Sequence, residues 1–199
     1  MLVIDIEATG LDARKNSIVS IGGVDFNNPK RQFYEECRIF EGAEIDEESL
    51  LVNGFTRSEC LDKRKKTLRE VMILFKSWID ESSGDKILAG QCAFYDREIL
   101  NESFKRSAIE FQFHFRIIEL HSITYFDFIK KGLNPPMEED HSALSLDKVL
   151  NYVGLPSEPK PHNALVGAKM EAEAISRIFY GKNLLEEYKK HKIPEKFIK

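Results

Sequence analysis

The chain has 199 residues, which suits one domain with a sizeable core, and its 42% hydrophobic and 31% charged residues are ordinary for a soluble globular protein. Its net charge of −4 argues against a long basic groove for duplex nucleic acid. No apolar run approaches the ~20 residues of a membrane span, no signal peptide is expected, and the three cysteines form no C-x-x-C pair. They are expected to be free thiols in a reducing, cytoplasmic setting.

Three strands are predicted first, at Leu2–Ala8, Ile18–Phe26 and Phe33–Ile39. Turn residues and short connections separate them, which favours antiparallel pairing. A helix is predicted to begin at Thr67, because Thr67 and Glu70 fit a capping box and apolar residues follow at helical spacing.

The rest of the chain alternates short strands with helices, and this order predicts an α/β layer fold with a mixed sheet whose first three strands are antiparallel and flanked by helices. We expect one domain over residues 1–181 and a basic tail over 182–199. The predicted elements are strands at Lys86–Ala89 and Phe111–Ile118, helices at Asp96–Arg106, Leu120–Lys130 and Asn163–Tyr180, a helix capped by Ser145 that ends near Gly154, and a loop at Gly132–His141.

Two acidic residues, Asp5 and Glu7, lie in the first predicted strand. Alternating side chains on a strand share a face, so both carboxylates project to the same side. Two carboxylates about 4 Å apart repel by roughly 4 kcal/mol at an effective dielectric near 20. Divalent ions such as Mg²⁺ and Mn²⁺ relieve this repulsion, so the pair is a candidate metal site. The alternative is a surface strand end with two solvated acids.

Two further candidates are Asp96 and His162. Asp96 follows a buried strand where the chain turns into a helix, a place where α/β folds expose functional groups; alternatively it is an ordinary helix N-cap. His162 stands at the start of the last predicted helix, where it is placed to act as a general base, since its ordinary pKa lies near neutrality. The alternative for His162 is a surface loop position.

Together these segments resemble the DEDDh (DnaQ-like) family of 3′→5′ exonucleases, which includes the epsilon proofreading subunit of bacterial DNA polymerase III, oligoribonuclease and RNase T. Any one motif is weak, but their order and spacing together are specific, and the resemblance spans roughly residues 2–180. The matching segments are residues 5–12 (DIEATGLD), residues 45–56, Asp96 with Leu100, residues 145–156, and residues 162–165 (HNAL).

The resemblance implies a ribonuclease-H-like fold and two divalent ions, Mg²⁺ or Mn²⁺, about 3.5–4 Å apart. It implies that Asp5 bridges both ions and that Glu7 binds the ion that activates water. Asp96 would support the second ion, and His162 would accept the proton of the attacking water. The expected product is a nucleoside 5′-monophosphate released from the 3′ end of single-stranded DNA or RNA.

The resemblance also implies where the terminal nucleotide binds. Ala8, Thr9, Gly10 and Leu11 match the family residues that hold it by backbone contact and apolar packing. Phe55 would add a face on which a base stacks, or it belongs to the core. The sequence does not indicate whether the substrate is DNA or RNA.

One position departs from the family pattern. The last acidic ligand falls five residues after the histidine, and here that residue is Gly167. The ion that activates water is therefore expected to bind less well. Three explanations remain open: an inactivated variant of an active nuclease, a degenerate nuclease that binds ends without cutting, or compensation by Glu171. Glu171 lies one helical turn further on the same face, and its alternative is a solvated surface position.

Three functional interpretations follow. The first is a metal-dependent 3′→5′ exonuclease whose activity is weakened or lost through Gly167. The second is a catalytically silent module that binds nucleic-acid ends or mononucleotides. The third, weaker one is a proofreading subunit that docks to a polymerase. A homodimer is a further partner suggested by the family, but the sequence carries no interface signal.

Overall fold

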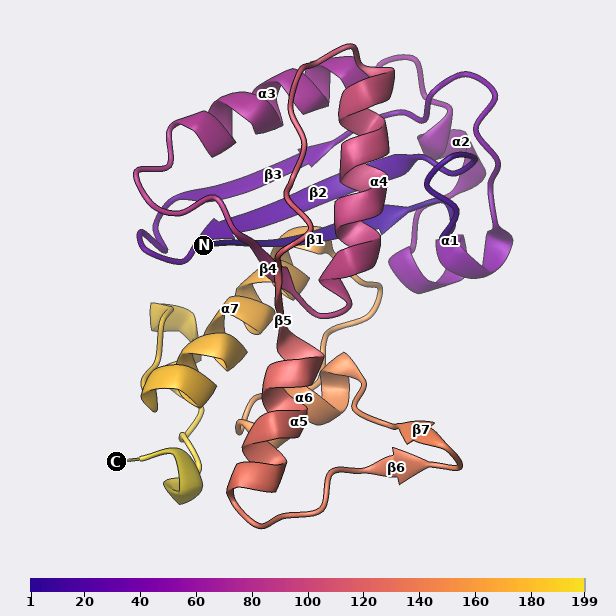
Figure 1. Ribbon diagram of the computed structural model, residues 1–199. Helices are drawn as coiled ribbons and strands as arrows, with labels where there is room; N and C mark the ends of the chain where they lie inside the picture. The colour runs from indigo at the N-terminus through magenta and orange to yellow at the C-terminus, as the bar shows by residue number, and fades with distance from the viewer. Residues whose placement is uncertain (199) are drawn as a thin grey trace.

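The protein, in a computed structural model that describes residues 1–198, is built on a five-stranded mixed sheet (Figure 1). The strand order is β3-β2-β1-β4-β5, with antiparallel β1–β2 and β2–β3 pairs and parallel β1–β4 and β4–β5 pairs. This confirms the predicted mixed sheet with three antiparallel strands first. The strands are β1 (Leu2–Ala8), β2 (Ile18–Asp25), β3 (Gln32–Glu36), β4 (Leu88–Gly90) and β5 (Ile118–Glu119).

Helices cover both faces of this sheet, α3 and α4 on one side and α7 on the other (Figure 1). The helices are α1 (Glu47–Asn53), α2 (Arg57–Cys60), α3 (Leu68–Asp80), α4 (Ala93–Arg106), α5 (Leu120–Lys130), α6 (Leu146–Tyr152) and α7 (Ala164–Tyr180). Two 3₁₀ turns (Glu186–Tyr188 and Glu195–Phe197) and a small hairpin of β6 (Met137–Glu138) and β7 (His141–Ser142) complete the described chain. No helix among residues 1–198 is both long enough and apolar enough to cross a membrane.

Side-chain alternation along β1 divides its residues between two cores. Leu2 and Ile4 pack with α3 and α4, whereas Val3 packs with α6 and α7. The same alternation directs Asp5 and Glu7 to the α7 side of the sheet. Each aliphatic side chain buried in this way stabilises the fold by about 1.5–3 kcal/mol. The two acids are thus carried by a strand whose position is fixed from both faces.

A glycine lets α7 approach the sheet beside Asp5. Gly22 is the residue opposite Asp5 on β2, and a Cβ added there would overlap the carbonyl oxygen of Ala164. Ala164 is the first residue of α7, and the side chain of Asn163 caps it by accepting from the Leu165 and Val166 amides. The start of α7 is therefore held against β2, next to the β1 acids.

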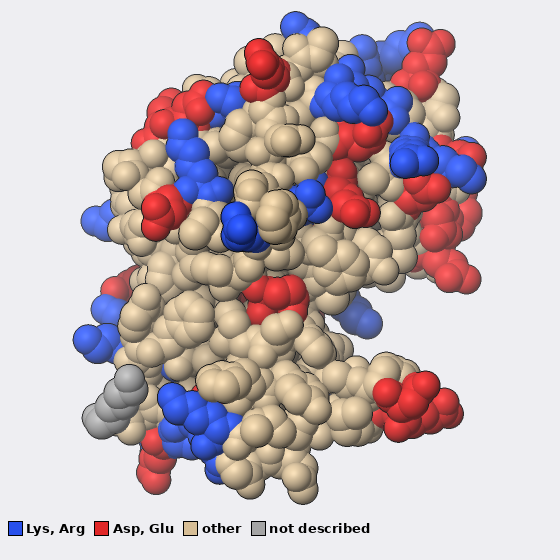
Figure 2. Space-filling view, in the orientation of Figure 1, with Lys and Arg blue, Asp and Glu red and all other residues tan. Residues whose placement is uncertain are grey.

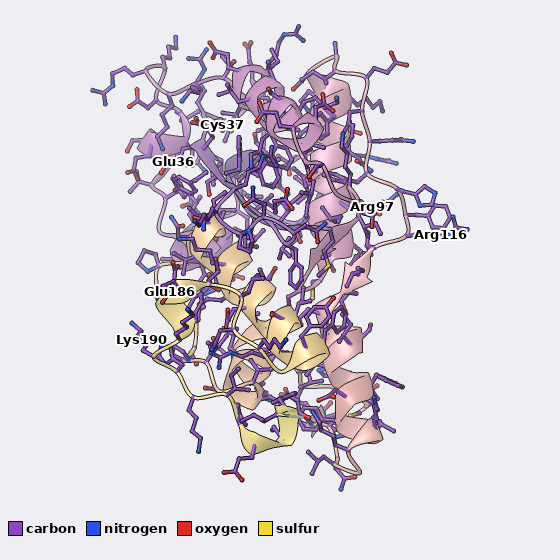
Figure 3. The ribbon with its side chains drawn as sticks, turned by 90° about the vertical axis from the view of Figure 1, so that its left-hand side faces the viewer. Glu36, Cys37, Arg97, Arg116, Glu186 and Lys190 are labelled. Atoms are coloured by element: carbon purple, nitrogen blue, oxygen red, sulfur yellow. The ribbon has the colours of Figure 1, made fainter. Side chains whose placement is uncertain are left out.

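The C-terminal segment runs along α7 (Figure 3). Arg177 of α7 is fully buried, bonds Glu173 at 2.9 Å, and donates to the carbonyls of Tyr188 and His191 at 3.1 and 3.0 Å. Phe197 is buried in the core formed with α6 and α7. Residues 182–198 are thus packed on the helices, and Lys199, the last residue of the predicted basic tail, lies outside the described residues.

The predicted strand Phe111–Ile118 is wrong for most of its length, because only Ile118 enters the sheet. The side chain of Asn101 takes the place of a neighbouring strand: it donates to the Phe113 carbonyl at 3.1 Å and accepts from the Phe113 amide at 2.7 Å. Phe111 and Phe113 meet edge to face, 5.1 Å apart, and pack against Phe104. The segment is therefore irregular chain held by aromatic packing.

Other boundaries also differ from expectation. Helix α4 begins at Ala93, so Asp96 lies in its first turn and is not its N-cap. The short helices α1 and α2 were not predicted, although Asp46 and Thr56 cap them. The predicted loop contains the β6–β7 hairpin, whereas the capping box at Thr67 is confirmed.

Candidate active site

The two acids of β1 lie toward the carboxyl end of the strand, beyond Leu2 and Val3, which pair with the parallel strand β4. Glu7 is buried, and burial followed by the negative charges of Glu158 and Asp96 raises its pKa to about 8. Burial also raises the pKa of Asp5 well above its usual range, with Glu171 the strongest of the acids that add to the effect. The pKa values of Glu7 and Asp5 rise for the same physical reason, since low dielectric and like charges both disfavour a charged carboxylate.

Asp96 joins these acids from the first turn of α4. It is buried, and burial raises its pKa to about 7 even though hydrogen bonds from its own backbone and from that of Ile6 favour the charged form. The loop between β4 and α4 turns sharply at Cys92, whose φ is 54° and whose amide donates to Glu119 at 2.6 Å. This turn carries the chain from the parallel strand to the helix, so that Asp96 faces the end of β1.

His162 precedes α7 and is about one third exposed. Its amide donates to the Val52 carbonyl at 3.1 Å, which ties the loop to α1. Its ring Nδ1 lies 3.6 Å from Oε2 of Glu158, an ion-pair distance that is too long for a hydrogen bond. The ring is thus open to solvent on one side and faces a carboxylate on the other.

Glu158 is a residue of this site that the sequence did not reveal. It comes from the loop after α6, is 8% exposed, and its amide donates to Asp147 at 2.9 Å. Its Oε1 is buried without a hydrogen-bond partner. Burial raises its pKa, which the charge of His162 lowers in part. A single acid in a loop has no periodic pattern around it. The only sequence signal for Glu158 is that it lies four residues before His162.

Helix α7 brings Gly167 and Glu171 to the same cluster. Glu171 is 2% exposed, which overturns the solvated surface alternative for this residue. Its Oε2 has no hydrogen-bond partner, and burial together with the charge of Asp96 raises its pKa well above the usual range. Gly167 lies directly against the Asp5 carboxylate.

Five carboxylates therefore gather here, and among residues 1–198 no lysine or arginine forms an ion pair with any of them. A buried anion cluster without cations is costly unless metal ions neutralise it. Two of the oxygens, on Glu158 and Glu171, are orphaned, and carboxylate oxygens are the donors that Mg²⁺ and Mn²⁺ prefer. These residues therefore fit a divalent-ion site. Among the described residues, no group of three or more acids, histidines or cysteines is arranged closely enough to hold an ion as it stands.

A cavity of about 380 Å³ opens beside Glu7 and Asp96, between β1 and α1. Leu11 at its edge is 70% exposed, so its apolar side chain is accessible to a molecule in the cavity. The other lining residues include Ala8, Gly10, Val52, Asn53 and Tyr95.

The structure does not bring every predicted nucleotide-contact residue to this cavity. Thr9 is fully buried, and its hydroxyl donates to the Glu44 carbonyl at 2.7 Å. Phe55 packs in a small core with α1, and Lys65 Nζ lies 4.7 Å from its ring centre. Tyr95, which the sequence analysis did not single out, offers the aromatic face that lines the cavity.

The surface around the site carries mixed charge. Figure 2 shows lysine and arginine interspersed with acidic residues over the visible face, without a continuous basic stripe. Figure 3 shows Arg116 on the irregular 111–117 segment, projecting away from the body of the molecule.

Three solved structures are similar to this fold. The nuclease domain of 3'hExo, a DEDDh family member bound to rAMP, has a TM-score of 0.68 at 17% identity over 98% of this chain and 95% of that one. Cell-death related nuclease 4 (CRN-4) has a TM-score of 0.68 at 19% identity over 92% of this chain and 64% of that one. The zinc-ion-bound E. coli exonuclease I–ssDNA complex has a TM-score of 0.68 at 14% identity over 91% of this chain and 41% of that one.

The chain thus spans less than two thirds of the last two proteins, and at these identities the likeness concerns the fold. No curated protein sequence matches the chain. The mixed sheet with acids from β1 and α4 at its carboxyl edge defines a ribonuclease-H-like exonuclease domain. The chain belongs to the RNase T family of exonucleases, whose family model, described as exonuclease, matches residues 2–175. This confirms the resemblance to DEDDh exonucleases.

Proposed function

We propose that this chain is a metal-dependent 3′→5′ exonuclease that releases nucleoside 5′-monophosphates from single-stranded DNA or RNA. The observation that carries the proposal is a cluster of five carboxylates, four of them buried and that of Asp5 half-buried, without a balancing lysine or arginine among residues 1–198 and beside an open cavity and His162. The family match supports nuclease chemistry on nucleic acid. The ligands named for similar structures, rAMP and single-stranded DNA, support end binding.

Asp5, Glu7 and Asp96 would hold Mg²⁺ or Mn²⁺, because all three offer hard carboxylate oxygens. When bound, the ions supply activation of water and neutralisation of charge on the phosphate. The zinc-bound exonuclease I complex supports divalent-ion use in this fold. Three carboxylates against two divalent ions leave the charge incompletely balanced, which is why the Gly167 position matters.

His162 would take the proton from a water that attacks the last phosphodiester, since its ring is reachable from solvent. The new bond forms between the water oxygen and phosphorus, and the bond from phosphorus to the 3′ oxygen of the shortened strand breaks. The carboxylate of Glu158, 3.6 Å from Nδ1, would stabilise the imidazolium that results. The 3′ oxygen leaves with a proton taken from solvent, and the imidazolium returns its proton to solvent.

The terminal nucleotide would bind in the cavity beside Glu7. Ala8 and Gly10 would contribute backbone contacts there, and Leu11 an apolar surface for the base. Tyr95 supplies an aromatic face, and stacking of one base on such a face contributes about 1–3 kcal/mol. Thr9 would act only through its backbone, because its hydroxyl is already bonded.

The experiment that tests this proposal uses single-stranded DNA and RNA oligonucleotides labelled at the 5′ end, with Mg²⁺ or Mn²⁺. We expect a ladder that shortens from the 3′ end and free nucleoside 5′-monophosphate. The Asp5→Asn variant should lose about 10²-fold or more of the rate. No shortening by the wild type with either ion or either substrate would reject the exonuclease.

A silent nucleic-acid-end binder is the second candidate, favoured only by Gly167 at the position of the fourth acid. It predicts binding of oligonucleotide ends without product. Polymerase docking in proofreading, a homodimer and a cytoplasmic location remain predictions. Size measurement and co-purification with a polymerase would test the partners.

A further inference from the structure

The space next to Gly167 is already filled by carboxylates. A Cβ added to Gly167 would overlap Oδ2 of Asp5 and would lie 3.2 Å from Oε1 of Glu158. These are oxygen atoms of two acids, one from β1 and one from the loop after α6. An acidic side chain at position 167 would therefore project into the place where the Glu158 carboxylate already stands.

Glu158 is held so that its two oxygens face different groups. Oε2 lies 3.6 Å from His162 Nδ1, whereas Oε1 is buried beside Gly167 and Asp5 without a hydrogen-bond partner. The amide of Glu158 is anchored by Asp147, the second residue of α6, at 2.9 Å. An orphaned, buried carboxylate oxygen is costly, and a cation beside it removes that cost.

Glu171 occupies a different part of the cluster. Its Oε2 lies 3.0 Å from the point where a Cβ on Gly90 would stand, at the end of β4, and a hydrogen bond from the Gln91 backbone favours its charged form. The three atoms nearest to a Cβ at position 167 belong to Asp5 and Glu158, and none belongs to Glu171. Glu171 thus lies on the β4 side of the acidic cluster, one helical turn along α7 from Gly167.

We propose that Glu158 supplies the fourth carboxylate of the divalent-ion site, so that the acid has moved from α7 to the loop before His162. This inference rests on the proposed function and identifies its complete ligand set. Gly167 is then the residue that leaves room for the Glu158 carboxylate beside Asp5. Glu158 also links the ion site to His162 through its second oxygen.

The assignment makes an unusual prediction for position 167. Gly167→Asp in the otherwise unchanged protein adds another acid where two already meet, so it should not improve ion binding. In a protein that carries Glu158→Ala, which removes the carboxylate and vacates its place beside Gly167, the same Gly167→Asp change supplies the acid that was removed. The two substitutions should therefore compensate for each other.

The test is a titration of the full chain with Mn²⁺, followed by calorimetry and by the paramagnetic resonance of free Mn²⁺. Glu158→Gln should weaken the binding of Mn²⁺ by about tenfold or more, whereas the matched surface change Glu138→Gln should leave it unaltered. Glu158→Ala should weaken Mn²⁺ binding in the same way, and Glu158→Ala with Gly167→Asp should recover most of that loss. Glu158→Ala with Gly167→Ala, which adds a Cβ without an acid, should not.

Unchanged Mn²⁺ affinity in Glu158→Gln would overturn the assignment, and so would tighter binding in Gly167→Asp alone. Circular dichroism shows whether each variant is folded, and if the double variant is not, the isosteric Glu158→Gln result decides. Asp5→Asn distinguishes a failure of the Glu158 assignment from a failure of the proposed metal site. If Asp5→Asn loses Mn²⁺ binding and Glu158→Gln does not, only the role of Glu158 is rejected. If neither substitution changes Mn²⁺ binding, the metal site and the proposed function are both rejected.

Discussion

Asp5 lies at the centre of the acidic cluster, in contact with Gly167 and under the influence of four other acids. In the metal-free protein its charge is a source of instability, because burial and like charges both oppose ionisation. The residue that we propose as an ion ligand is thus unfavourable for the fold without ions. Such opposition between stability and function is common at active sites.

Asp5→Asn should therefore raise the melting temperature of the metal-free protein at about pH 8, while it abolishes activity. For a chain of this size each kcal/mol gained corresponds to roughly 2–4 °C. Thermal unfolding in the presence of a chelator measures the effect. Glu138→Gln is the matched control, and as a surface change it should stay within about 0.5 kcal/mol of the wild type. A lower melting temperature for Asp5→Asn would show that its carboxylate is stabilising without ions.

Among the elements, the irregular segment before β5 depends on a single side chain of α4. Asn101 bonds both the amide and the carbonyl of Phe113, which a neighbouring strand would do in a regular sheet. This arrangement lets the Phe113 ring enter the core against Phe75, 6.4 Å away. The element that resembles a strand in the sequence is thus fixed by contacts from a helix.

Asn101→Ala should destabilise the protein by about 1–3 kcal/mol, since it leaves two backbone groups of Phe113 without partners. Asn101→Asp keeps the acceptor and loses the donor, so it should lower the free energy of unfolding by less than Asn101→Ala does. Urea unfolding followed by fluorescence of Trp78, whose ring stacks 5.8 Å from Phe75, reports on the same core. A change within about 0.5 kcal/mol for Asn101→Ala would mean that aromatic packing alone holds the segment.

The features that could be predicted from the sequence are those that depend on residues close together in the chain. The alternation of β1 places Asp5 and Glu7 on one face, and the capping box at Thr67 starts α3, because these depend on neighbours in the chain. The 111–117 segment and the role of Glu158 depend on partners far away in sequence or on a loop without periodicity. The short helices α1 and α2 carry caps that are readable only after the helices are known.

At the scale of the whole molecule, the acidic cluster couples folding to pH and to ions. The pKa of Glu7 is raised to about 8 and that of Asp96 to about 7, against usual values of 4.5 and 3.8. Between the usual and the raised values the folded protein binds more protons than the unfolded chain does, so the stability falls as pH rises. Divalent ions held at the proposed site would bind the deprotonated acids and reverse this trend, because they would release the same protons.

The metal-free protein should therefore melt at progressively lower temperature as the pH rises from about 5 to 8, and added Mn²⁺ should raise the melting temperature most at the upper end of this range. Thermal scans across the range, with chelator and with Mn²⁺, measure both effects. A variant with Glu7→Gln and Asp96→Asn should make the metal-free curve shallower and reduce the Mn²⁺ effect, since it lacks two of the five carboxylates whose pKa is raised. A metal-free melting temperature that stays level or rises toward pH 8 would mean that the cluster opens to water and charges at little cost, and the electrostatic argument for ions at this site would fail with it.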